Sequence, residues 1–331
     1  MITRRQVFAP LGAALLITSS LPMAQSRPQK TVRVAYLAIG SRTSDGKPPT
    51  ILIEALAGLG YVEGKNIAYV ARFAEGKVES LPALAAELVR IGVDIIVTQG
   101  GPATLAAKQA TTQIPIIMGS VAGNAVATGL IESLARPGGN VTGMSDENVG
   151  LNSKRMQLLK ETLPKAARIA IIWNANDPGM SVRFTAMQKA AEILKIKVDS
   201  IEVRKSEDFA GALDTIGKLR TDAILVVFDV LTILNRQQVL EGAAALRIPA
   251  MYEVGQFVDA GGLMSYGPSF ADGMRRTAGY IDQIVKGAKV FDLPAEQPTR
   301  FYLTLNLKTA AKLGLTFPPT LRLIADEVIG E

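Results

Sequence analysis

The chain has 331 residues, 48 % of them apolar, with 36 basic and 30 acidic side chains and a formal net charge of +6. This length suits two domains, and the apolar content supports a sizeable core and excludes wholesale disorder. The sequence contains no cysteine and no histidine, which excludes disulfides, thiolate nucleophiles, histidine triads and His/Cys zinc sites. Its basic side chains are dispersed, so we expect no nucleic-acid partner.

The first 26 residues have the pattern of a secretory signal peptide. Arg4 and Arg5 form a positive start, residues 7–23 form an apolar stretch, and residues 24–26 (AQS) form a small-residue cleavage site. The segment TRRQVF also resembles a twin-arginine export signal, and a general secretory signal is the alternative. We therefore predict an exported, periplasmic mature protein.

The next part of the chain alternates apolar, strand-like runs with amphipathic helical runs. We expect strands at residues 31–39, 66–73, 93–98, 114–118 and 140–144. We expect helices at residues 49–60, from a cap at Ser80 to about 89, at 103–110 and around 126–135.

The pattern then starts again and ends in a tail. We expect strands at residues 168–173, 197–203, 222–228, 248–252, 261–267 and 301–305. We expect helices at residues 151–163, 181–194, 209–219, 236–246, 270–287 and 308–313.

Such alternation predicts an α/β fold of parallel sheets with helices on both faces. Two successive sets of about five strands exceed one comfortable open sheet, so we predict two doubly wound Rossmann-like lobes joined by a multi-strand hinge. The N-terminal lobe would comprise residues 31–145 plus about 267–293, and the C-terminal lobe residues 146–266 plus about 298–331. The chain would then cross between the lobes three times.

Small and polar residues stand at the carboxyl ends of the predicted strands, where open α/β sheets bind ligands. Helix starts can hold a carboxylate through backbone N–H groups, acidic side chains can hold an amine, and a flat ligand could stack on an aromatic ring. For any single position, turning or capping is the competing explanation. The candidates are Ser41, Gly100, Gly101, Pro102, Ser120, Ser145, Asn174, Asp177, Asp229, Tyr252 and Glu253.

The run Gly100-Gly101-Pro102 could let an anionic group approach the backbone. It lacks the GK[ST] of a Walker loop and the spacing of a dinucleotide fingerprint. We therefore predict no nucleotide or other cofactor, and no metal.

Several long motifs, spread over almost the whole mature chain, resemble the ABC-transporter substrate-binding protein family that includes tryptophan- and tyrosine-binding members. These motifs are LGYVEGKNI (59–67), LPALAAELV (81–89), AAKQATTQIPI (106–116), SLARPGGNVTG (133–143), SKRMQLLKE (153–161), GGLMSYG (261–267), DQIVKGAK (282–289), LPAEQPTRF (293–301) and NLKTAAKLGL (306–315).

The resemblance implies a type I periplasmic-binding-protein fold, with a three-strand hinge, a solute held between two lobes and no catalytic role. Contacts expected from it are Ser41, Gly101, Pro102, Ser120, Ser145, Asn174 and Asp229. One departure concerns Asn124-Ala125-Val126, which stands where relatives usually have Asp-Pro-Val. We include Asn124 among the candidate ligand-binding residues, and the lost carboxylate weakens the expectation of aromatic amino-acid specificity.

Together these patterns predict the periplasmic solute-binding component of an ABC importer, a monomer whose partners are inner-membrane ABC permease subunits. Its solute would be a small organic molecule such as an amino acid, aromatic or related. A receptor that feeds a sensor is one alternative. A secreted carboxylate-dependent enzyme is another, since Asp146-Glu147 is an acidic pair, although neighbouring acids in a loop are commonly only solvated.

Overall fold

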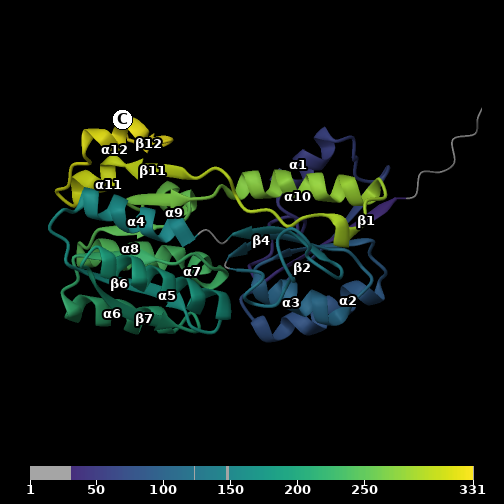
Figure 1. Cartoon of the computed structure of the whole chain (residues 1–331), viewed down its shortest axis with the longest axis horizontal. Coiled ribbons are helices and arrows are strands. Elements are labelled where there is room, and N and C mark those ends of the chain that lie inside the picture. The colour runs from purple at the N-terminus through teal and green to yellow at the C-terminus, as the bar shows by residue number, and fades with distance from the viewer. Residues whose placement is uncertain (1–30, 123, 147–148, 331) are drawn as a thin grey trace, which may run out of the picture. The chain divides into compact units, whose positions relative to one another are not determined.

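The computed structural model describes residues 31–330 except 123 and 147–148 (Figure 1). The predicted signal peptide, residues 1–26, lies outside the described residues. So do the side chains of residues 120–122 and 149.

Five parallel strands form the first sheet, in the order β2-β1-β3-β4-β5. They are β1 (Val32–Ala38), β2 (Ile67–Phe73), β3 (Ile95–Gln99), β4 (Ile116–Ala122) and β5 (Val141–Asp146).

Side chains alternate along each strand, so both faces of this sheet present apolar residues, and helices cover both faces. In β1, Ala35 and Leu37 pack with α2 (Leu81–Arg90) and α3 (Gly101–Ala110). The intervening residues Val34 and Tyr36 pack with α1 (Thr50–Gly58) and α10 (Phe270–Val285). Burial on both faces explains why these strands read as nearly continuous apolar runs. Figure 1 shows α10 beside α1, although more than two hundred residues separate them in the sequence.

Seven strands form the second sheet, in the order β12-β11-β10-β9-β8-β6-β7, parallel except for the antiparallel pair β10–β11. They are β6 (Arg168–Asn174), β7 (Lys197–Val203), β8 (Ala223–Val226), β9 (Ala250–Tyr252), β10 (Met264–Gly267), β11 (Tyr302–Asn306) and β12 (Glu327–Ile329). The associated helices are α4 (Val149–Thr162), α5 (Pro178–Ile193), α6 (Asp208–Leu219), α7 (Val230–Leu234), α8 (Arg236–Leu246), α9 (Gly255–Asp259), α11 (Leu307–Lys312) and α12 (Pro319–Ile324).

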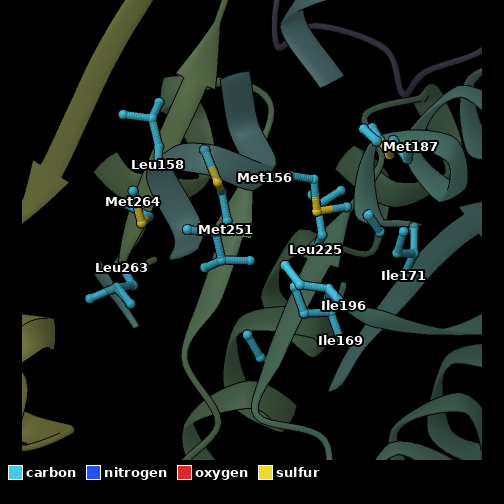
Figure 2. Packing of buried hydrophobic residues seen from close by; sticks show 14 of the residues in the cluster. Met156, Leu158, Ile169, Ile171, Met187, Ile196, Leu225, Met251, Leu263 and Met264 are labelled. Atoms are coloured by element: carbon cyan, nitrogen blue, oxygen red, sulfur yellow. The ribbon is translucent and has the colours of Figure 1, made fainter. Parts of the chain in front are cut away.

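The core on one face of this sheet is rich in methionine. Met156, Met251 and Met264 belong to one buried cluster with Ile169 and Leu225, and Figure 2 shows them together. Unbranched thioether side chains adapt to irregular gaps between a helix layer and a sheet. The two layered sheets confirm the predicted doubly wound α/β fold with two lobes.

The chain passes between the two sheets three times: from β5 to α4, from β10 to α10, and from η2 (Val290–Asp292) to β11. Backbone hydrogen bonds join two of these segments, because Glu296 N donates to Gly143 O at 2.9 Å and Ser145 N donates to Glu296 O at 2.9 Å.

Two local predictions were wrong. No helix forms at residues 126–135 in the described structure; instead Asn124 Oδ1 accepts hydrogen bonds from Val126 N and Ala127 N, and a single turn ends at Gly129 with a positive φ. Ser80 does not cap α2 through its side chain, which donates to Lys77 O, because the 3₁₀ turn η1 (Val78–Ser80) leads directly into the helix.

Candidate ligand-binding cleft

A cleft of about 810 Å³ lies at the carboxyl ends of strands from both sheets. The first sheet contributes the ends of β1 and β3 with the start of α3, and the second contributes residues that follow β6, β7 and β8. This is the edge at which open parallel sheets bind ligands. Six of the predicted site residues line it: Gly100, Gly101, Pro102, Asn174, Asp177 and Asp229.

One wall of the cleft is the start of α3. Gly100 has φ 92° and ψ 150°, a backbone conformation open essentially only to glycine. Its carbonyl accepts bonds from Thr104 N at 3.1 Å and Thr104 Oγ1 at 3.0 Å, which fix the first turn. Among the described residues no side chain caps this ten-residue helix at its start. Its first N–H groups and the positive end of its dipole can therefore receive an anionic group.

The opposite wall carries Asn174, Asp177 and Asp229. Asn174 Nδ2 donates to Asp229 Oδ2, and Asp229 Oδ1 accepts from Thr232 N at 2.8 Å in a capping box that starts α7. Asp177 is the N-cap residue of α5, because its Oδ1 accepts from Gly179 N at 2.8 Å. The predicted alternatives of capping and ligand contact are thus compatible, since a carboxylate has several acceptor positions.

Burial perturbs both carboxyl groups. It raises the pKa of Asp177 to about 6, and the nearby Asp229 adds to the rise while the bond from Gly179 opposes it. Burial also raises the pKa of Asp229, against the lowering effect of its bonds from Thr232 and Asn174. A cation beside these two carboxylates would stabilise their charged forms and so lower both pKa values again.

Apolar side chains complete the lining. Val78 and Leu234 are unusually exposed for large apolar side chains, with 46 % and 37 % of their surface accessible. Exposed apolar groups gathered in a cleft mark a place for an apolar ligand body. The apolar lining comprises Ile39, Val78, Phe228, Val230, Leu231 and Leu234.

Other predicted residues lie outside this lining. Ser41 is exposed just beyond β1, and Asn124 uses its side-chain oxygen to hold the turn that follows β4. Ser145 is buried, and its Oγ accepts a bond from Ala125 N at 3.3 Å. The side chain of Ser120 lies outside the described part of the structure.

Tyr252 and Glu253 also lie away from the cleft lining. The Tyr252 ring stacks on Phe257 at 4.6 Å, and burial raises the pKa of its hydroxyl. Glu253 is only 1 % exposed and belongs to a buried cluster with Asp146, Arg155 and Arg183.

This buried charge cluster contains two carboxylates and two guanidinium groups. Arg155 Nη1 lies 2.8 Å from Glu253 Oε1, Arg183 Nη2 lies 3.0 Å from Asp146 Oδ2, and Arg183 Nη1 pairs with Glu253 Oε2. Opposite charges in equal number are what makes such deep burial tolerable.

The cluster also binds backbone near the segments that join the sheets. Arg155 Nε donates to Tyr266 O at 2.8 Å, Arg183 Nη2 donates to Asp146 O at 2.9 Å, and Phe228 N donates to Glu253 Oε2 at 3.0 Å. Because Phe228 lines the cleft, the cluster fixes part of the cleft wall as well as the end of β5.

The sequence reading missed two loops of the lining. One follows β2 and includes Glu75 and Lys77, and the other follows β7 and includes Arg204 and Ser206. Both loops follow the carboxyl ends of edge strands, β2 and β7, so the preference of ligands for strand ends also indicates them. Among the described residues no three carboxylates gather closely enough to hold a metal ion.

Two layered sheets, three crossing segments and a cleft at the strand ends define the fold of type I periplasmic binding proteins. The family model described as ABC transporter substrate binding protein matches residues 43–329, and the chain belongs to this family.

Known relatives resemble the chain along most of its length. A tyrosine-binding protein of Clostridioides difficile (strain R20291) is 26 % identical over 291 residues, 88 % of this chain and 82 % of that protein. A structure of an ABC domain in complex with L-Trp from Streptococcus pneumoniae has a TM-score of 0.84 and 25 % identity, covering 91 % of this chain and 100 % of that one. A conserved domain protein of Vibrio cholerae O1 biovar eltor has a TM-score of 0.85 and 25 % identity, with 90 % and 100 % covered.

Within the part of the chain that the structure describes, no helix has both the length and the apolar character needed to cross a membrane.

Proposed function

We propose that the chain is the solute-binding component of an ABC importer and that it binds an amino acid, aromatic or related, in the cleft. The observation that carries this proposal is the pairing of the two walls. The uncapped start of α3 suits a carboxylate, while Asp177 and Asp229 suit an ammonium group. The apolar lining between them suits the side chain of the solute.

The relatives support an amino acid as the solute. The Clostridioides difficile protein is named for tyrosine, and the Streptococcus pneumoniae structure holds L-Trp. The Asn124-Ala125 departure lies in a turn outside the lining of the cleft. The carboxylate that relatives have there is therefore not one of the proposed contacts with the solute.

Binding would be coupled to closure about the three crossing segments, which we propose as the hinge. Few backbone hydrogen bonds, such as the one from Ser145 N to Glu296 O, join these segments to one another. Closure would therefore bend mainly the short connections between the two sheets. Closure around a solute that engages both walls would be the signal to the permease. The protein would recognise the solute and deliver it for transport without changing it chemically.

The test is a calorimetric titration with L-tryptophan and L-tyrosine, each compared with truncated analogues. Tryptamine lacks the carboxylate and indole-3-propionate lacks the ammonium group, so each should bind at least about tenfold more weakly than L-tryptophan. Glucose serves as a control with neither group. A chain that binds glucose and none of the amino acids would contradict the proposal.

We also propose export to the periplasm through residues 1–26, given the family and the arginine pair at Arg4 and Arg5. Expression of the full chain in a Gram-negative host should release a periplasmic product that starts near Arg27. N-terminal sequencing of that fraction checks the cleavage, and replacement of both arginines by Lys checks the twin-arginine route. A product found only in the cytoplasm would contradict export.

A further inference from the structure

Arg183 is a buried arginine of α5 that contacts two separate parts of the chain. Its Nη2 donates to Asp146 O at 2.9 Å and to Asp146 Oδ2 at 3.0 Å, and its Nη1 donates to Glu253 Oε2. Asp146 is the last residue of β5, where the chain leaves the first sheet, and Glu253 directly follows β9 of the second sheet. One guanidinium group therefore joins the first crossing segment to the second sheet.

The Glu253 carboxylate continues this connection to the wall of the cleft. Its Oε2, which Arg183 holds, also accepts a hydrogen bond from Phe228 N at 3.0 Å. Phe228 lines the cleft and precedes Asp229, one of the carboxylates proposed to bind the ammonium group of the solute. A movement of Asp146 relative to the second sheet would therefore either break a bond of Arg183 or displace the backbone next to Asp229.

The second crossing segment is held at the same carboxylate. Arg155 Nη1 lies 2.8 Å from Glu253 Oε1, and Arg155 Nε donates to Tyr266 O in β10 at 2.8 Å. The next residue, Gly267, ends β10, and a Cβ added there would overlap with Glu253 O. This packing leaves no room for the end of β10 to approach Glu253 more closely, so the start of the second crossing segment is fixed as well.

The contacts of Arg183 depend on the shape of the guanidinium group. Its N–H donors point in fixed directions from a planar fork, so one side chain holds Asp146 and Glu253 at once. A lysine would keep the positive charge, but its single nitrogen cannot occupy the positions of both Nη1 and Nη2. Stability alone does not account for such a cluster, because apolar side chains of similar volume often stabilise a core at least as well as buried ion pairs do.

We propose that Arg183 is a positioning residue for solute binding. It holds the crossing segment at Asp146 in the arrangement in which the wall formed by Phe228 and Asp229 is set to receive the solute. Arg183 is not part of the lining of the cleft in the described structure, so it acts on the solute only through these residues. The inference rests on the proposed function of the cleft and adds a residue that controls binding from outside it.

The experiment measures the arrangement of the two sheets and the affinity in Arg183→Lys. The chain has no cysteine, so spin labels attached through Gln109→Cys on α3 and Lys218→Cys on α6, both exposed, report one distance by pulsed electron paramagnetic resonance. Without solute, Arg183→Lys should shift the equilibrium about tenfold away from the natural distance, the effect of one hydrogen bond to a charged group. The apparent Kd for L-tryptophan should rise by the factor by which that population falls. The preference for L-tryptophan over tryptamine should stay the same, because the groups that contact the solute are unchanged.

Two further variants separate positioning from stability. Arg168→Lys is the matched control, because Arg168 pairs through Nε and Nη2 with Asp199 between β6 and β7, outside the lining of the cleft and the crossing segments. It should leave both the distance and the affinity as they are. Asp146→Asn weakens the same contact from the other side and should shift the distance in the same direction as Arg183→Lys. The double variant should then add little to Arg183→Lys, because both changes remove one interaction.

Three outcomes would overturn the proposal. The first is an unchanged distance distribution in Arg183→Lys and Asp146→Asn. The second is an equal shift in Arg168→Lys, which would mean that the loss of any arginine pair loosens the chain. The third is full additivity in the double variant. If the natural chain binds no amino acid, the proposed function fails, and the distances in the chains without solute still decide whether Arg183 holds the crossing segment.

Discussion

Asp177 combines a structural and a proposed binding role in one carboxyl group. Its pKa of about 6 lies above the ordinary 3.8 because the group is buried. If the solute's ammonium binds the carboxylate, protons compete with it as the pH falls through 6. The affinity for L-tryptophan should therefore be full above about pH 7 and about tenfold weaker at pH 5. Calorimetric titrations between pH 5 and 8, where the charges of the amino acid are constant, measure this profile.

The control for this pH profile is Asp177→Asn, which keeps an oxygen acceptor for Gly179 N while removing the titrating group. Its affinity should be lower at pH 8 and nearly constant down to pH 5. An equally steep profile in this variant would assign the titration to another group.

Glu253 is a buried carboxylate whose contribution to stability depends on its two arginine partners. Glu253→Gln would leave the buried Arg155 and Arg183 with Asp146 as their only remaining carboxylate in the cluster. We expect a loss of about 3–5 kcal/mol in the free energy of unfolding, measured by urea denaturation.

Glu63→Gln is the matched control for Glu253→Gln, since Glu63 pairs with Lys47 in the open, with 41 % of its side chain exposed. It should cost less than about 1 kcal/mol. Similar losses in the two variants would show that burial does not decide the effect.

Residue-level prediction from sequence succeeded where the local chain decides the environment. Gly100, Gly101 and Pro102 stand between a buried strand and a helix, and that local order is enough to place them at the cleft. Glu253 also follows a strand, yet its environment depends on Arg155 and Arg183, which are distant in the sequence. Nothing in their local patterns distinguishes them from arginines on a solvated helix face.

At the scale of elements, strand β5 depends on a glycine. Gly143 has φ 119°, and a Cβ there would lie 2.5 Å from Met118 O of the neighbouring strand β4. Gly143→Ala should cost at least about 3 kcal/mol in the free energy of unfolding, because strain and a backbone clash add. Urea denaturation followed by circular dichroism measures this loss.

Gly139→Ala is the comparison for Gly143→Ala. Gly139 also has a positive φ, 63°, but open space surrounds the position of its Cβ. Only the backbone cost of about 1–2 kcal/mol should appear. Equal losses in both variants would mean that the contact with β4 is unimportant.

Long helices were predictable, and two of the shortest helices were not. Helix α10, with sixteen residues, buries Met274, Thr277, Ala278 and Ile281 at helical spacing, a periodicity visible in the sequence. Helices α7 and α9, with five residues each, are too short for a pattern. The Asp229 capping box starts α7, and α9 is held by its buried Phe257 and Val258. The false helix at 126–135 has an apolar composition, but Gly129 and the Asn124 side chain favour a turn there.

For the whole molecule, we expect the radius of gyration to fall when the solute binds. A solute that contacts both walls of the cleft would favour the conformation in which both contacts form. Small-angle scattering with and without saturating L-tryptophan measures the change. An unchanged radius at saturation would contradict closure about the hinge.

A chain without histidine still has, in Asp177, a group that titrates near pH 6. At that pH about half of the unliganded molecules carry a proton on Asp177, and an arriving ammonium group has to displace it. Uptake of solute and release of protons are then linked, so the heat of binding near pH 6 will depend on the ionisation enthalpy of the buffer. The slope of that dependence counts the displaced protons.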